Sequence, residues 1–197
     1  MPKRVFDLLA AGCGVLLLLP VLLLIMLWIK LDSPGPVFFR QERVGRFGKP
    51  FRIHKFRTMY VDAEARGLQL TVGADPRVTR SGQFLRHYKL DELPQLLDVL
   101  LGQMSLVGPR PEVPRYVAHY PADVRDKVLS VRPGLTDLAS IEYRHENRLL
   151  GESSDPEHTY LHEVMPNKLR INLQYVDNHG LFSDIGILWR TLQVLFR

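Results

Sequence analysis

The stretch Ser81–Pro111, SGQFLRHYKLDELPQLLDVLLGQMSLVGPRP, contains the most informative pattern in the chain. Its leucines recur at helical spacing, which predicts two short helices packed against a core. Asp91 and Glu92 stand where the first helix would end and the second would begin. Pro94 fits that boundary, because a proline near the start of a helix removes an N–H that has no internal acceptor. We therefore expect Asp91 to be the N-cap of the second helix, which Gly102 would end.

Cationic side chains surround this acidic pair, namely Arg86, Lys89 and Arg110. An aspartate at a helix N-terminus lies at the positive end of the helix dipole, which favours its ionised form and also attracts phosphate. Carboxylates beside arginine and lysine suit phosphoryl chemistry with a metal ion. The alternative is that Asp91 and Glu92 are solvated surface residues, as most acidic pairs on helices are. A packed leucine face on both helices argues for the first interpretation, because it fixes the position of the pair.

Four motifs follow one another after an N-terminal apolar segment: KFRTM (55–59), LDELPQLLDVL (90–100), MSLVGPRP (104–111) and RPG (132–134). In order and spacing they resemble the motifs of the bacterial monotopic phosphoglycosyl transferases, in that family's minimal form. These enzymes start exopolysaccharide, O-antigen and glycoprotein-glycan assembly on a polyprenyl phosphate. The resemblance covers nearly the whole chain. It breaks down at 135–140, LTDLAS, where many members have a pattern like ITGWAQ, so the sugar preference of other members does not carry over.

The resemblance implies transfer of a sugar 1-phosphate from a nucleotide diphosphate sugar, most typically a UDP-sugar, to polyprenyl phosphate, with release of UMP. It implies Mg²⁺ as the cofactor, with Asp91 and Glu92 at the metal. Asp91 would be the nucleophile that forms an aspartyl-phosphosugar intermediate. Glu92 would help to bind Mg²⁺ or orient the second substrate. Lys55, Arg86 and Arg110 would bind phosphates.

The composition limits the number of domains and the classes of partner that the chain can have. With 197 residues and 46% hydrophobic content, the chain can bury one sizeable core and carry a membrane element. A net charge of +5 suits nucleic acid, anionic lipid or a small anionic substrate. No helix-turn-helix or RRM-like aromatic pattern is visible, so we expect no nucleic-acid partner. A single cysteine, Cys13, excludes an internal disulfide.

The stretch from Leu8 to Ile29 carries no charge. At about 1.5 Å per residue it is long enough to cross a hydrocarbon core of about 30 Å. A signal peptide is the rival interpretation, but no small-residue cleavage site follows, and Trp28 beside Lys30 is typical of an interfacial anchor. We therefore expect a retained membrane segment.

Positive charge lies on both sides of this segment, which indicates that both of its ends face the cytoplasm. Pro20 would favour a bend, because it removes one helical hydrogen bond. A straight span with a tolerated proline is the alternative. The resemblance favours a re-entrant helix that bends at the proline, although Leu19 stands where some members have serine, which could hydrogen-bond to the freed carbonyls.

Taken together, we expect an α+β fold that is mostly helical, with a short β-hairpin, an N-terminal re-entrant membrane helix and interfacial amphipathic helices. Residues 1–36 would form the membrane helix and linker, and 37–197 a catalytic domain on the cytoplasmic side of the bacterial inner membrane. Local patterns predict strands at Val37–Arg43, Phe51–Phe56 and Leu138–Tyr143, and helices at Pro121–Val131 and Leu181–Arg197. The last helix has a broad apolar face, which could lie in a membrane interface or pack on the core.

The expected partners are a UDP-sugar, polyprenyl phosphate and membrane lipids, and a homo-oligomer is left open. His158 and His162 are four residues apart, but no HExxH pattern accompanies them, so we expect no histidine metal site. Two alternatives to an enzyme remain. One is a non-catalytic membrane scaffold of a glycan assembly complex, for which the carboxylates of Asp91 and Glu92 would be dispensable in cells. The other is a membrane-tethered nucleic-acid binder, which would bind DNA in a salt-dependent way.

Overall fold

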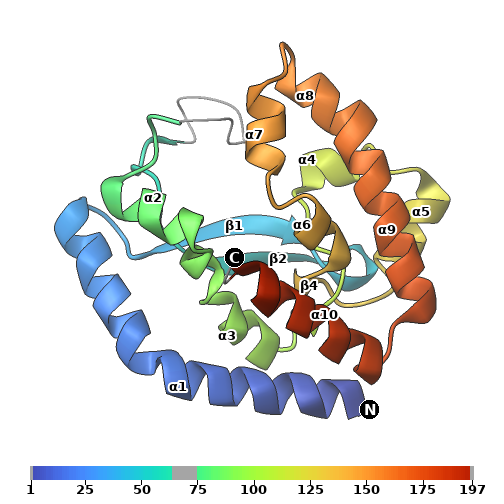
Figure 1. The fold of residues 1–197 in the computed structure, drawn as a ribbon, viewed down its shortest axis with the longest axis horizontal. Coiled ribbons are helices and arrows are strands. Elements are labelled where there is room, and N and C mark those ends of the chain that lie inside the picture. Colours follow the sequence, from blue (N-terminus) through green and yellow to red (C-terminus); the bar gives the residue numbers. More distant parts are fainter. Residues whose placement is uncertain (1, 64–74, 196–197) are drawn as a thin grey trace.

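The structure is a computed structural model that describes residues 2–63 and 75–195. It is a mostly helical α+β fold, as the sequence predicts, and it contains two small sheets (Figure 1). The elements in chain order are α1 (Pro2–Asp32), β1 (Phe38–Val44), β2 (Pro50–Phe56), α2 (Arg80–His87), α3 (Gln95–Leu100), β3 (Ser105–Val107), α4 (Pro114–Val117), α5 (Ala122–Val128), β4 (Gly134–Thr136), α6 (Leu138–Glu142), α7 (Glu146–Gly151), α8 (Pro156–Thr159), α9 (Met165–Asn178) and α10 (Leu181–Leu195).

The predicted hairpin is present. Strands β1 and β2 pair antiparallel, with Phe38 opposite Phe56 and Val44 opposite Pro50. At the turn, Phe47 adopts a left-handed backbone with φ 58°. The hairpin brings β2, which contains Lys55, next to α3 and to the turn Leu90–Glu92.

A second sheet was not predicted from the sequence. Strands β3 and β4 pair parallel, with Ser105 opposite Gly134 and Val107 opposite Thr136. Each strand is three residues long, which is too short for an alternating pattern to be read. The backbones of these two segments approach so closely that a Cβ on Gly134 would lie 2.1 Å from the backbone nitrogen of Gly108. This contact fixes the start of the proline-rich turn that carries Arg110.

Helix α6 replaces the strand predicted at Leu138–Tyr143, so that prediction was wrong. Asp137 adopts an extended backbone before the helix, and its side chain accepts a hydrogen bond from the amide of Ser140 at 2.5 Å. An N-cap of this kind starts a helix even in a segment with strand-like composition. The predicted helix at Pro121–Val131 is confirmed as the shorter α5, and Leu181–Arg197 as α10 within the described residues.

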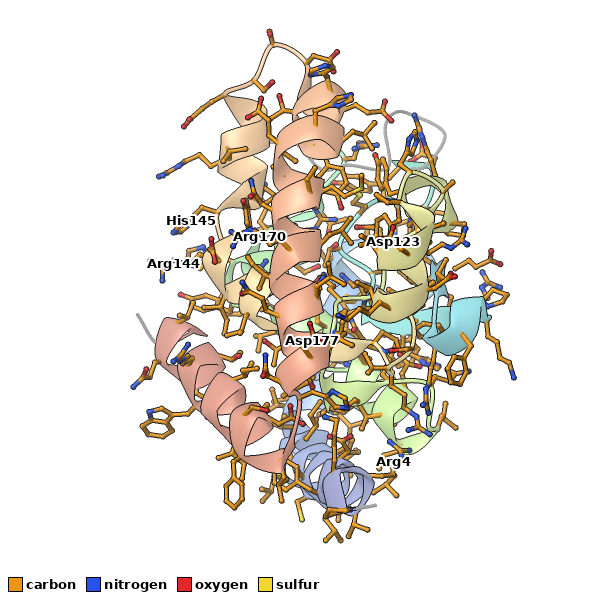
Figure 2. The ribbon with its side chains drawn as sticks, turned by 90° about the vertical axis from the view of Figure 1, so that its right-hand side faces the viewer. Arg4, Asp123, Arg144, His145, Arg170 and Asp177 are labelled. Atoms are coloured by element: carbon orange, nitrogen blue, oxygen red, sulfur yellow. The ribbon has the colours of Figure 1, made fainter. Side chains whose placement is uncertain are left out.

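The long N-terminal helix α1 contains Pro20, and Figure 1 shows that its two arms point in different directions. In the described part of the chain only α1 is long and apolar enough to cross a membrane, by length and composition. Its first arm is held by polar contacts. Arg4 donates to the carbonyl of Val99 in α3 at 2.8 Å (Figure 2), Asp7 accepts from Ser105 Oγ at 2.8 Å, and Lys3 pairs with Asp184 of α10.

The other end of α1 is also attached to the rest of the chain. Asp32 accepts hydrogen bonds from the amide and the hydroxyl of Ser81, at 2.9 and 2.7 Å. Arg57, which is buried, donates to the carbonyl of Ser33 at 2.7 Å and to that of Pro34. These contacts join the end of α1 to the start of α2 and to the residue that follows β2. Both ends of α1 therefore pack on one body, while leucines between them, such as Leu16 and Leu17, are exposed.

The buried apolar residues form clusters that hold the elements in place. One cluster joins α1, β2, α3, β3 and α10 through Ala11, Ile53, Val99, Val107 and Ile187. A second lies among α4, α5 and the helices from α7 to α9, and includes Tyr116, Val128, Tyr160 and Leu169.

Candidate active site

Asp91 and Glu92 lie in a 3₁₀ turn, Leu90–Glu92, between α2 and α3. Lys89, with φ 56°, reverses the chain just before it. The prediction that Asp91 is the N-cap of the second helix was wrong, because α3 begins at Gln95 and Pro94 occupies the capping position without a side-chain hydrogen bond. The carboxylate of Asp91 is therefore not used to cap this helix.

Glu92 binds two of the predicted phosphate-binding cations. Lys55 Nζ donates to Glu92 Oε1 at 2.7 Å. Arg110 Nη1 donates to Glu92 Oε2 at 2.8 Å, and Arg110 Nη2 donates to Oε1. This two-point contact is the planar fork geometry that arginine makes with a carboxylate.

Asp91 is 7% exposed and has weaker partners. Its Oδ2 lies 4.0 Å from Lys55 Nζ. Its Oδ1 is buried and has no hydrogen-bond partner among the described residues. A buried carboxylate oxygen without a partner is costly for folding, so its retention points to a role in binding or chemistry.

Arg86 is in α2 and its Nε donates to Thr58 Oγ1 at 2.8 Å. Its charge still acts on Asp91, where it favours the ionised carboxylate. The structure thus brings Asp91, Glu92, Lys55 and Arg110 into one cluster and places Arg86 at its side.

The environment moves the pKa values of the two carboxylates in opposite directions. Burial, reinforced by the charge of Glu92, raises the pKa of Asp91 against the opposing effect of Lys55. Burial alone would also raise the pKa of Glu92, but Arg110 and Lys55 outweigh it and hold that pKa well below its ordinary value. Two neighbouring carboxylates separated in this way can take different roles.

The cations are affected as well. Burial lowers the pKa of Lys55, although Glu92 acts in the opposite direction. The charge of Glu92 raises the pKa of Arg110, which therefore stays protonated across the whole working range. Lys55 is the one of the two whose charge can be lost at alkaline pH.

The position of Arg110 depends on residues that the sequence did not single out. Its backbone N–H donates to Asp137 Oδ2 at 2.9 Å, and the amide of Gly134 donates to the carbonyl of Pro109 at 3.0 Å. Asp137 is 1% exposed and belongs to the run LTDLAS. The available signal in the sequence was that this run departs from the pattern of many family members. We interpreted that departure in terms of sugar preference and did not connect it with the Arg110 turn.

A metal ion has few protein ligands here. Among the described residues no group of three or more His, Cys, Asp or Glu side chains is arranged to hold one. Asp91 Oδ1 is available, whereas both oxygens of Glu92 are bound by cations. Mg²⁺ commonly binds through one or two carboxylates together with substrate phosphates, and this donor set fits that mode.

Comparisons with known proteins give the following similarities. A family model described as bacterial sugar transferase matches residues 1–197. The chain is 40% identical over 195 residues to the UDP-glucose:undecaprenyl-phosphate glucose-1-phosphate transferase of Caulobacter vibrioides, covering 98% of this chain and 69% of that protein. It is 39% identical over 193 residues to the protein of the same description from Escherichia coli, covering 96% of this chain and 39% of that protein.

A third relative is the UDP-N-acetylgalactosamine-undecaprenyl-phosphate N-acetylgalactosaminephosphotransferase of Aeromonas hydrophila. The identity is 36% over 195 residues, covering 98% of this chain and 43% of that protein. The chain thus spans less than half the length of the Aeromonas and Escherichia relatives. The names of the relatives also differ in the sugar that is transferred.

Proposed function

The chain belongs to the bacterial sugar transferase family, and we propose that it transfers a sugar 1-phosphate from a UDP-sugar to undecaprenyl phosphate, releasing UMP. The observation that carries the proposal is the buried, unpartnered Oδ1 of Asp91 beside Lys55, Glu92 and Arg110. Relatives named for this reaction, with glucose or N-acetylgalactosamine, support it. The product would initiate exopolysaccharide, O-antigen or glycoprotein-glycan assembly.

Asp91 acts as the nucleophile in this proposal. Its Oδ1 attacks the sugar-linked phosphorus, a bond between carboxylate oxygen and phosphorus forms, and the bond from phosphorus to the UMP oxygen breaks. An oxygen of undecaprenyl phosphate then attacks the aspartyl-phosphosugar, which releases the lipid-linked product and restores the carboxylate. Because little covalent chemistry is required of the protein, fixed positions and charges supply most of the catalysis.

The cations hold the two polyanions. Lys55 and Arg110 bind Glu92 in the structure, and they exchange part of this contact for phosphate oxygens when the donor enters. Glu92 keeps both cations aimed at the site before substrate arrives, and then orients the second substrate. Arg86 adds positive charge from the side of α2.

Mg²⁺ would be the cofactor in this proposal, and Asp91, with Glu92 beside it, would hold the ion. When bound, the ion offsets the negative charge that develops on the phosphate oxygens. Asp91 would contact the ion through Oδ2, which leaves the unpartnered Oδ1 for the attack on phosphorus.

We further propose that residues 1–36 form a re-entrant membrane helix with its linker and that 37–197 form a catalytic domain on the cytoplasmic face. The attachment of both ends of α1 to one body supports this arrangement. Helix α10 presents exposed Phe182 and Trp189 and would lie in the membrane interface, where aromatic side chains are favoured.

The full chain in detergent or nanodiscs, incubated with Mg²⁺, undecaprenyl phosphate and a panel of UDP-sugars, should release UMP with one or a few sugars. Intact-protein mass spectrometry with donor alone should show a phosphosugar adduct that Asp91→Asn lacks. Release of UDP instead of UMP, or turnover without an adduct under single-turnover conditions, contradicts the covalent route. Normal glycan production in cells that carry only Asp91→Asn would favour the scaffold role.

A further inference from the structure

Glu112 follows the proline-rich turn and lies at the centre of a partly buried polar network. Arg43 Nη1, from β1, donates to Glu112 Oε1 at 3.1 Å. The hydroxyl of Tyr160 donates to Glu112 Oε2. The amide of Val113 donates to Oε1 at 2.8 Å. Both carboxylate oxygens of Glu112 are therefore bound by other groups of the chain.

The same residues hold the backbone of the turn. Arg43 Nη1 also donates to the carbonyl of Pro111 at 3.1 Å. The amide of Val44 donates to the carbonyl of Glu112 at 2.9 Å. These bonds fix the chain immediately after Arg110, as the bond from its amide to Asp137 fixes the chain at Arg110 itself.

At neutral pH the network has Glu112 ionised and Tyr160 protonated. Burial would raise the pKa of Glu112, but Arg43 and Lys168 outweigh it, and the hydroxyl of Tyr160 lowers it further. Burial and the charge of Glu112 raise the pKa of Tyr160, which stays protonated and able to donate. A half-buried carboxylate with this set of partners has little freedom to rotate.

Tyr160 brings the second apolar cluster into the network. Its ring packs against that of Tyr116, with centroids 4.9 Å apart, and the ammonium of Lys168 lies 5.5 Å from its centroid. The hydroxyl of Tyr116 is buried and has no partner among the described residues. The two tyrosines therefore share their packing and differ in their hydroxyl contacts.

We propose that Glu112, held by Arg43 and Tyr160, is a positioning residue for Arg110. It acts through the backbone of the turn, where it fixes the origin of the Arg110 side chain relative to Glu92 and the donor phosphates. Misplacement of a binding group by about 1 Å can cost about a hundredfold in rate, so a network that prevents it contributes to activity. The kinetic part of the test rests on the proposed function.

The first comparison uses Tyr160→Phe and Tyr116→Phe, which each remove one hydroxyl from the same stacked pair. Tyr160→Phe should lower kcat/KM for the UDP-sugar by roughly threefold to tenfold, because Glu112 loses a donor. Tyr116→Phe should keep wild-type kinetics. Equal effects of the two variants would overturn the proposal, because the loss would then come from shared packing.

The second comparison is a double-mutant cycle between Glu112→Gln and Arg110→Lys. Arg110→Lys cannot reproduce the two-point contact and should lower kcat/KM by at least about tenfold. Glu112→Gln should show the same division of the loss between kcat and KM, and should add little in the Arg110→Lys background. Fully additive losses would overturn the proposal, because Glu112 would then act independently of Arg110.

Hydrogen exchange gives a readout that does not require turnover. Glu112→Gln should speed exchange at the amides of Val44, Arg110 and Val113, while peptides from α1 and α10 keep wild-type protection. Unchanged exchange around the turn would overturn the positioning role. Absence of UMP release from the wild type would instead count against the proposed function, whatever the exchange data show.

Discussion

At the scale of single residues, the adjacent carboxylates Asp91 and Glu92 differ in what surrounds them. Glu92 has a cation on each oxygen, so its charge stabilises the fold. Asp91 is more deeply buried, has an oxygen without a partner and has a raised pKa. A carboxyl whose pKa is raised in the folded state lowers stability as pH rises from its ordinary pKa through its folded-state pKa, because the unfolded chain ionises first. In the proposed mechanism, activity requires ionised Asp91, whereas the stability of the fold is higher when Asp91 is protonated.

Asp91→Asn and Glu92→Gln should have different effects on turnover and on stability. Asp91→Asn should abolish turnover and leave the melting temperature equal to or above that of the wild type, because it removes a poorly compensated charge. Glu92→Gln should lower the unfolding free energy by about 1–3 kcal/mol, because Lys55 and Arg110 lose their counter-charge. For each variant, thermal unfolding measures the change in stability, and UMP release measures the change in turnover. A less stable Asp91→Asn protein would show that the carboxylate is structurally compensated.

The pH dependence of kcat/KM should be bell-shaped. On the acid side, activity falls as Asp91 is protonated, with an apparent pKa above the ordinary 3.8 because burial raises it. On the alkaline side, activity falls as Lys55 loses its proton, with an apparent pKa below 10.5 because burial lowers it. These apparent values belong to the coupled cluster. A profile that stays flat down to pH 4 would contradict a raised pKa for the carboxylate on which activity depends.

At the scale of elements, the sequence was informative where a pattern repeats. The hairpin and α10 were predicted because alternating or helical spacing extends over several residues. The strand predicted where α6 lies failed because one side chain, Asp137, starts the helix. The second sheet was missed because its pairing depends on contact between distant glycines, which no local pattern records.

In the candidate site, too, the sequence predicted some residues and missed others that depend on long-range contacts. Lys55, Asp91, Glu92 and Arg110 were predicted as a cluster, on resemblance and charge. The supporting contacts of Asp137 and Glu112 were not predicted, because they join residues far apart in the chain. A carboxylate in a sequence does not reveal whether a backbone amide elsewhere will donate to it.

Gly134→Ala tests the close approach of β3 and β4. The added methyl group would lie 2.1 Å from the nitrogen of Gly108, so the strands must separate and the Arg110 turn must move. We expect a loss of about 2–5 kcal/mol of unfolding free energy together with lower kcat/KM. Gly186→Ala is the matched control, because nothing lies within 4 Å of its added Cβ and alanine favours a helix. A Gly134→Ala protein as stable as this control would show that the strands can separate freely.

At the scale of the whole molecule, α1 is joined to the same body at both ends, although its middle is exposed and apolar. Lys3 pairs with Asp184, and Arg57 binds carbonyls at the far end. A straight membrane span would place these two ends on opposite sides of the bilayer, about 30 Å apart. One rigid body cannot contact both ends of such a span from a single side.

Cysteine labelling in cells can decide between the two topologies. Pro2 is exposed and makes none of the contacts that hold α1, so Pro2→Cys in a Cys13→Ala background provides one thiol before the helix. Lys127→Cys in the same background provides a thiol in the body, on α5, as the matched control. A membrane-impermeant reagent applied to intact cells reaches only thiols on the periplasmic side.

We expect both thiols to be protected in intact cells and both to be labelled once the cells are opened, because α1 enters and leaves the same leaflet. Pro20 makes the return physically plausible, since it frees a carbonyl one turn earlier and weakens the helix there. A freed carbonyl in lipid costs several kcal/mol unless it is sheltered, so the bend would sit near the headgroups or against the protein. Labelling of Pro2→Cys alone in intact cells would establish a straight span, and the contacts of Lys3 with α10 would then have to be absent in the membrane.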